Sequence, residues 1–181
     1  QNNLEKKSLH YYSMQIESSL LKLVNKSKYI VKYYGSYYSR NMDNLWIILE
    51  YCCSGSSLDL MLAMNRTYSE IEVATIMEMI LQGLIMIHSM NLIHRDIKAA
   101  NILLSEEGYA KLSHFGVGVQ MKNKDFRLSK KGSSFWMSPQ VASCSDYDTK
   151  TDIWSLGITC IELIEGESPL NDLKPTFTMN K

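Results

Sequence analysis

The sequence has no net charge, because 19 acidic residues balance its 19 basic ones. A chain without an overall basic field has no general attraction for nucleic acid or anionic membranes, so we expect neither as a partner. The basic stretch 122–131 is then expected to be a solvated loop. The four cysteines have neither the paired spacing of zinc ligands nor the density of a secreted disulfide scaffold. A reducing, cytoplasmic location fits these absences best.

Features of membrane targeting and of repeat proteins are also missing. No apolar run approaches the length needed to cross a bilayer, and residues 1–7 contain no apolar core of a signal peptide. No internal repeat or low-complexity tract supports a solenoid or a linker. The chain begins at Gln1 rather than at Met, so we expect a fragment of a longer protein.

The composition provides enough apolar material for a globular core. Of the 181 residues, 45% are hydrophobic and 21% are charged, as in ordinary soluble domains. Helical spacing of apolar residues predicts an amphipathic helix over residues 8–24. Ser69 and Glu72 form a capping box before a second apolar helical face that runs to Ile87. A third, buried helix is predicted over residues 151–164.

Strands are predicted between and after these helices. Residues 30–38 and 45–51 are rich in β-branched and aromatic side chains, and the polar stretch 40–44 between them suits a hairpin loop. A second, shorter hairpin is predicted from residues 102–104 and 109–112. Helices and strands in this order predict an α+β fold.

The most informative segment is His-Arg-Asp-Ile-Lys-Ala-Ala-Asn at residues 94–101. It combines a carboxylate, an ammonium and an amide at spacings that suit phosphoryl transfer. In that chemistry an Asp accepts or orients the proton of the attacking hydroxyl, a Lys neutralises charge on the moving phosphoryl group, and an Asn binds a metal. Asp96, Lys98 and Asn101 are therefore the candidate catalytic residues. The alternative is a polar loop that carries this string by chance.

Together with three later motifs, this segment resembles the protein kinase family. The motifs are Lys-Leu-Ser-His-Phe-Gly at 111–116, where the family has Asp-Phe-Gly, Ser-Pro-Gln at 138–140, where it has Ala-Pro-Glu, and Asp-Ile-Trp-Ser-Leu-Gly at 152–157. Segments 31–37, 45–51 and 135–137 are similar to sterile-twenty-like serine/threonine kinases, most closely to their germinal-centre-kinase III branch. Lys98 suits serine/threonine specificity in this family.

The resemblance implies a partial kinase fold in two parts. Residues 1–51 would form a partial N-lobe with a helix and a hairpin, without the Gly-rich loop and the strand lysine that hold ATP in the family. Residues 52–181 would form a partial C-lobe with the hinge, the catalytic loop and the activation segment, cut short after the αF-type helix. The implied cofactors are ATP and Mg²⁺, and the implied substrate is a serine or threonine of a protein.

Further residues would bind the nucleotide in a protein of this family. Backbone groups of Glu50 and Cys52 would bind adenine at the hinge, and Leu103 would pack beneath the base. Glu17 would pair with the lysine that anchors ATP. For Cys52 and Leu103, a plain core position is the alternative.

The resemblance also implies regulatory and partner-binding positions. Ser129 falls where the branch carries its activation-loop phosphothreonine, and a phosphate there would pair with Arg95. A solvated loop serine is the alternative. Ser133 would face the hydroxyl of the substrate. The helix face around Glu17 would contact a helical scaffold protein, as in the branch.

Two substitutions depart from the family pattern. His114 replaces the carboxylate that would bind the metal together with Asn101, and imidazole suits Mg²⁺ poorly because this ion prefers oxygen ligands. Gln140 replaces a glutamate and loses the charge that locks the activation segment to an arginine. We expect binding of ATP and Mg²⁺ to be weak or absent. Selected change, decay of a gene copy and read errors are equally compatible with both substitutions.

Two functional hypotheses follow. The first is a homologue of the serine/threonine kinases whose phosphate transfer is impaired. The alternative is a pseudokinase that presents surfaces to partner proteins and transfers no phosphate. A metal-dependent response to ATP would distinguish them.

Overall fold

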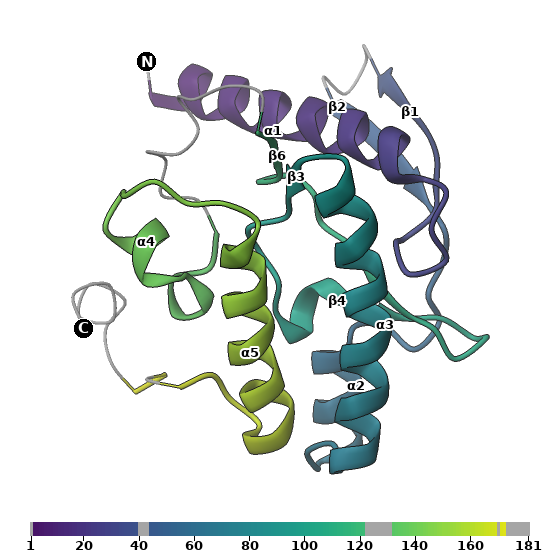
Figure 1. Ribbon diagram of the computed structural model, residues 1–181. Coiled ribbons are helices and arrows are strands. Elements are labelled where there is room, and N and C mark those ends of the chain that lie inside the picture. Colours follow the sequence, from purple (N-terminus) through teal and green to yellow (C-terminus); the bar gives the residue numbers. More distant parts are fainter. Residues whose placement is uncertain (1, 40–43, 122–131, 170, 173–181) are drawn as a thin grey trace.

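The computed structural model describes residues 2–39, 44–121, 132–169 and 171–172. Its helices are α1 (Asn2–Val24), α2 (Ser57–Met64), α3 (Glu70–Ser89), α4 (Pro139–Ala142) and α5 (Lys150–Glu165), with short 3-10 turns η1 (Ala99–Asn101) and η3 (Ser134–Trp136). The strands are β1 (Tyr33–Ser39), β2 (Asn44–Leu49), β3 (Leu92–Ile93), β4 (Ile102–Leu104), β5 (Ala110–Leu112) and β6 (Val119–Gln120). Figure 1 shows α1 beside the β1–β2 hairpin, with α2, α3 and α5 forming the other part of the molecule. The predicted α+β class is confirmed.

Helix α1 and the hairpin are joined just after the helix ends. Leu21 and Val24 are fully buried in the core. The side chain of Asn25 donates to the carbonyl of Tyr33 at 2.8 Å and accepts from its amide at 2.7 Å. These two hydrogen bonds fix the start of β1 against the end of α1. The predicted helix is confirmed, but it begins earlier than expected, at Asn2.

Strands β1 and β2 form an antiparallel hairpin, as predicted. The first strand begins at Tyr33 rather than at Ile30, because Ile30 forms an isolated parallel bridge with Leu112. Most of the loop predicted between the strands lies outside the described residues. One face of the hairpin packs on α1, while the other exposes the stacked rings of Tyr37 and Trp46.

Helix α3 begins with the predicted capping box. The Ser69 side chain accepts from the Glu72 amide, and the Glu72 carboxylate accepts from the Ser69 amide. The predicted apolar face is buried at Val73, Ile76, Ile80, Leu84 and Ile87. This face packs against β5 and α5, so α3 is the central helix of the core.

Helix α3 also corrects one expectation drawn from the sequence. Glu70–Ser89 has a mean hydropathy of 1.5 over its most apolar stretch and is long enough to cross a membrane. This is weak evidence for a membrane span, because a buried core helix passes the same test of length and composition. A third of this stretch is buried, and α3 packs against β5 and α5.

Periodicity does not predict helix α2, because its 8 residues give too short a pattern. Its start nevertheless carries a second capping box. The Ser56 side chain accepts from the Asp59 amide, and the Asp59 carboxylate accepts from the Ser56 amide and hydroxyl. Asn65 ends the helix in the left-handed region, with φ of 49°. The Ser-x-x-Asp spacing was therefore the available signal.

Two short strand pairs flank the loop at residues 94–101. Strands β4 and β5 form the second predicted hairpin, whose turn contains Gly108 with φ of +81°. Strands β3 and β6, which the sequence analysis did not predict, pair over two residues each. The segments before and after the loop are thus both held by strand pairing.

Helix α5 is confirmed, but it does not bury the predicted face. Leu156 and Leu163 are buried together with the polar residues Asp152, Ser155, Thr159 and Glu162. Four large apolar side chains are exposed instead, namely Ile153, Trp154, Ile161 and Ile164. The prediction of a buried apolar helix is wrong in this respect, because the buried polar side chains bond to the loop at 94–101 and to its neighbours.

Candidate active site

One buried carboxylate anchors the loop at residues 94–101 to helix α5. Asp152 accepts from the amides of His94 and Arg95, both at 2.9 Å. It also contacts Nε2 of His88 at 2.8 Å. Asp152 is fully buried, and a buried carboxylate is tolerated only where such partners surround it. The start of the loop is therefore fixed by α5.

A second carboxylate of α5 holds the loop further along. Oε2 of Glu162 accepts from the Ala99 amide and from the indole nitrogen of Trp136, both at 2.9 Å. Burial raises the pKa of Glu162, although these two bonds and the charge of Lys98 oppose the shift. Because Trp136 lies in η3, Glu162 ties the loop at 94–101 to the later segment 132–137.

Asp96 has the surroundings of a group that orients a hydroxyl. Its Oδ1 accepts from the amide of Ser133 at 2.9 Å and from its hydroxyl at 2.7 Å. Its Oδ2 accepts from Nδ2 of Asn101 at 2.7 Å and lies 3.7 Å from Nζ of Lys98. Burial alone would raise the pKa of Asp96, but the Ser133 bond, Lys98 and Asn101 outweigh it and lower the pKa. The carboxylate therefore stays ionised and can accept a proton.

Ser133 lies between this carboxylate and a lysine. Nζ of Lys98 donates to the Ser133 hydroxyl at 2.6 Å and lies 5.8 Å from the centre of the Trp136 ring. The structure thus brings Asp96, Lys98, Asn101 and Ser133 into one cluster. A hydroxyl in this cluster contacts a base and a cation together, which is the arrangement that phosphoryl transfer to a hydroxyl needs.

His114 lies between two carboxylates of different elements. Its Nε2 is 3.9 Å from Oδ2 of Asp96, and its Nδ1 is 3.8 Å from Oε1 of Glu17. The ring is half exposed, and the backbone φ of 61° is in the left-handed region. Glu17 also accepts from the Phe115 amide at 3.1 Å. The side chain of Glu17 therefore points into the site, towards residues 114–115.

The residues around His114 do not fit Mg²⁺. In the described part of the chain, no three His, Cys, Asp or Glu side chains are grouped so that they could hold a metal ion. Asn101 donates its amide nitrogen to Asp96, which leaves its side-chain oxygen as a single suitable donor, and His114 offers nitrogen where this ion prefers oxygen. The predicted metal site at Asn101 and position 114 therefore lacks a suitable donor set.

The predicted adenine-binding segment follows strand β2. The Glu50 amide and the Cys52 carbonyl form backbone hydrogen bonds within the protein. Among the described residues, no backbone hydrogen bond engages the Glu50 carbonyl or the Cys52 amide, so each residue keeps one backbone group for a ligand. Burial, and next the charge of Glu50, raises the pKa of the Cys52 thiol to about 11. Leu103, the predicted floor of the adenine site, is half-buried and forms a bridge with Ser56 at the end of this segment.

Gly132 brings the segment 132–137 against the loop at 94–101. Its φ is +120°, and a Cβ atom there would collide with the carbonyl oxygen of Arg95. The Arg95 side chain donates to the Val117 carbonyl at 2.6 Å and to the Tyr147 hydroxyl at 3.0 Å. Ser129, the predicted site of phosphorylation, lies outside the described residues.

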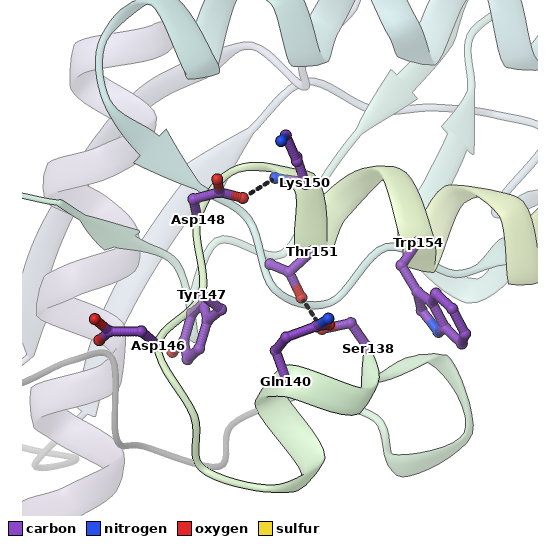
Figure 2. Close-up of a pocket in the computed structure, with 8 residues that line it drawn as sticks. All are labelled: Ser138, Gln140, Asp146, Tyr147, Asp148, Lys150, Thr151 and Trp154. Atoms are coloured by element: carbon purple, nitrogen blue, oxygen red, sulfur yellow. Dashed lines mark hydrogen bonds between the residues drawn. The ribbon is translucent and has the colours of Figure 1, made fainter.

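A cavity of about 510 Å³ lies next to α4 and the start of α5 (Figure 2). Its lining comes from residues 138–154 and includes Gln140, Tyr147 and Trp154. The hydroxyl of Tyr147, one of the lining residues, accepts from Arg95 of the loop at 94–101. It shares no lining residue with the predicted adenine site.

Sequence reasoning missed Glu162 and Trp136 as parts of the site and named Asp152 only within a motif. A signal for Glu162 was present, because a carboxylate among the apolar residues of a helix must find hydrogen-bond donors when it is buried. The indole of Trp136 carried no such signal.

Known proteins match most of this chain. A model of the protein kinase domain family matches residues 1–181. The serine/threonine-protein kinase cst-1 of Caenorhabditis briggsae is 50% identical over 151 residues, which is 83% of this chain and 30% of that protein. The serine/threonine-protein kinase hippo of Drosophila melanogaster is 48% identical over 150 residues, or 82% of this chain and 22% of that protein.

A third relative gives a similar match. The serine/threonine-protein kinase dst4 of Dictyostelium discoideum is 45% identical over 168 residues, which is 90% of this chain and 34% of that protein. The chain therefore spans about a third or less of the length of these curated relatives.

Proposed function

Because the chain belongs to the protein kinase family, we propose that it is a serine/threonine kinase module that binds ATP weakly and transfers phosphate poorly. The family generally uses ATP and Mg²⁺ and acts on protein substrates. The relatives are named as serine/threonine kinases, which favours a protein hydroxyl as the acceptor. In this proposal residues 1–51 and 52–181 are parts of the two kinase lobes, and the protein acts in the cytoplasm.

The acceptor side of the site supports phosphate transfer. Oδ1 of Asp96 lies 2.7 Å from a hydroxyl, that of Ser133. A substrate hydroxyl with the same contact would pass its proton to Asp96 as its oxygen attacks the terminal phosphorus of ATP, and ADP would leave. Lys98 would neutralise part of the charge on the moving phosphoryl group.

His114 is the observation that carries the expected loss of activity. In the family a metal ion neutralises charge on the phosphates, and His114 supplies nitrogen in place of the second oxygen ligand that this ion needs. Losing this stabilisation removes several kcal/mol, or about 10³-fold or more in rate. The backbone groups of Glu50 and Cys52 do not depend on the metal, so adenine binding is retained in this proposal.

A second candidate is a pseudokinase that binds partner proteins. It is favoured by the apolar side chains exposed on two elements, which are Tyr37 and Trp46 on the hairpin, and Ile153, Trp154, Ile161 and Ile164 on α5. Apolar side chains exposed in such numbers commonly mark a protein contact. A helical scaffold protein is the proposed partner.

Phosphate transfer from radiolabelled ATP to a generic basic protein tests the first candidate. We expect a signal that is low and that disappears in Asp96→Asn, because this change removes the base. Asp148→Asn, a carboxylate that bonds to Lys150 outside the cluster, is the matched control. Phosphate transfer by the wild type at a rate typical of the family would overturn the proposed impairment. No phosphate transfer at all would favour the second candidate.

A further inference from the structure

A buried ion pair lies close to the predicted adenine site. Nζ of Lys111 on β5 is 2.6 Å from Oε1 of Glu50, the first residue after β2. Only 10% of the lysine side chain and 14% of the glutamate side chain are exposed. None of the steps proposed for Asp96 and Lys98 uses this pair.

Lys111 belongs to the strand pair that would form the floor of the adenine site. Leu103 on β4 and Lys111 on β5 are directly opposite each other in the antiparallel register. Side chains of directly opposed residues lie on the same face of a sheet. The ammonium group thus extends from beside Leu103 to the beginning of the segment that would bind adenine.

The other end of this segment is attached to the same strand pair through the backbone. The Leu104 amide donates to the Gly55 carbonyl at 2.9 Å, and Ser56 forms a bridge with Leu103. Between the two attachments, Tyr51 is 88% exposed and contributes little packing. The ion pair therefore attaches the start of this segment, at Glu50, to β5 through side chains. The end of the segment, at Gly55 and Ser56, is attached to β4 through the backbone.

The energetics of buried ion pairs argue against a role in stability alone. Removing two charges from water costs free energy that their attraction only partly returns, and replacing both partners by apolar side chains is often neutral or stabilising. A pair of this kind is better explained by the geometry that it fixes.

We infer that Glu50 and Lys111 are positioning residues that hold the backbone at Glu50 and Cys52 at the height over Leu103 that an adenine ring requires. This inference rests on the proposed binding of nucleotide. It adds two residues whose side chains do not touch the nucleotide but set its affinity.

Binding of adenosine, measured by calorimetry, tests the inference. Adenosine has no phosphates, so its binding does not depend on His114 or a metal. We expect Lys111→Met to weaken binding by about tenfold or more and Lys111→Arg, which keeps the charge, to stay within about threefold. Arg66→Met breaks an exposed ion pair with Glu72 and should leave binding unchanged.

The double variant Glu50→Met/Lys111→Met separates positioning from stability. We expect it to melt close to the wild-type temperature and still to bind adenosine about tenfold more weakly. Wild-type affinity in this variant would overturn the inference.

Hydrogen exchange provides a readout that does not need a ligand. In Lys111→Met the Glu50 amide should exchange about tenfold faster or more, while the amides in the middle of α3 stay unchanged. If the wild-type chain binds no adenosine, the proposed nucleotide binding fails, and the exchange of Glu50 still decides whether the ion pair positions this segment. Unchanged exchange would overturn the inference.

Discussion

The indole nitrogen of Trp136 donates to the Glu162 carboxylate at 2.9 Å, through the same oxygen that accepts from the Ala99 amide. One side chain of α5 thereby fixes two segments of the site relative to each other. The ammonium of Lys98 lies over the ring of Trp136, and such cation–π contacts are favourable. The position of Lys98 beside Ser133 thus depends on a residue that contacts no reacting atom.

Glu162→Gln is expected to remove a pH-dependent cost of folding. Burial raises the pKa of this carboxyl above its ordinary value of 4.5 in the folded protein. A raised pKa means that the folded protein binds this proton more tightly than the unfolded chain does. The stabilisation that the bound proton gives to the folded state is therefore complete below pH 4.5 and is lost as the pH rises through the folded-state pKa. A glutamine oxygen can keep both hydrogen bonds but does not ionise.

Urea unfolding of the wild type and of Glu162→Gln at several pH values measures this effect. The free energy of unfolding of the wild type, relative to the variant, should fall from acidic towards neutral pH. Glu165→Gln, at an exposed position of the same helix, should show no such trend. A difference that stays constant with pH would contradict the assignment of the raised pKa to Glu162.

Three glycine-to-alanine substitutions should separate two costs to stability, the strain of a positive φ and the collision of the new Cβ atom with a neighbouring group. Gly132→Ala is expected to destabilise by more than the roughly 1–3 kcal/mol of a strained backbone, because its Cβ would also collide with the Arg95 carbonyl. Gly108→Ala has a positive φ but nothing within 4 Å of its Cβ, so it should cost about 1–2 kcal/mol. Gly157→Ala, inside α5 with open space around it, should stabilise by up to about 1 kcal/mol.

Thermal and urea unfolding of the three variants provide the measurement. If Gly132→Ala were no less stable than Gly108→Ala, the close approach of the segment 132–137 to Arg95 would be wrong. The order of the three values matters more than any one of them.

Features with short sequence separation were predictable from the sequence. The Ser69–Glu72 capping box spans three residues, and the candidates Asp96, Lys98 and Asn101 lie within six, so local spacing determines both. The bonds of Glu162 to Ala99 and of Asp152 to His94 cross separations of 63 and 58 residues. Such contacts depend on how the elements pack, which no local pattern contains.

Helix α5 shows the limit of periodicity most clearly. Its apolar residues predict burial, yet Trp154 and Ile161 are exposed because Asp152 and Glu162 need the interior face to reach the loop at 94–101. Satisfying a buried carboxylate outweighs burying another apolar side chain, since an unpaired buried charge costs far more.

His114→Asp should make the response to ATP depend on Mg²⁺. The wild-type chain offers nitrogen at this position, so ATP is expected to raise its melting temperature equally with and without the metal. An aspartate would supply oxygen ligands, and a ligand at about 100 times its Kd adds about 2.7 kcal/mol of stability. His114→Ala, which removes the imidazole without adding a carboxylate, is the control and should leave the response to ATP independent of Mg²⁺. Stabilisation of the wild type that already requires Mg²⁺ would show that His114 permits metal binding.

The outer face of the β1–β2 hairpin should cause the chain to self-associate. Tyr37 and Trp46 stack there with ring centres 6.3 Å apart, and about half of each side chain is exposed. Within the described residues β2 pairs only with β1, so its other edge also presents backbone groups that can pair with a second strand. Exposed apolar patches and open strand edges both promote association.

Sedimentation velocity over a range of concentrations tests this expectation with matched variants. Trp46→Lys should shift the chain towards monomer, because it places a charge in the patch next to the open edge. Tyr51→Lys changes a still more exposed aromatic residue outside the hairpin, so it should leave association unchanged. If both variants behaved alike, the hairpin face would not be the contact, and the apolar residues of α5 would be the next surface to alter. A wild-type chain that stays monomeric at every concentration would show that neither surface drives association.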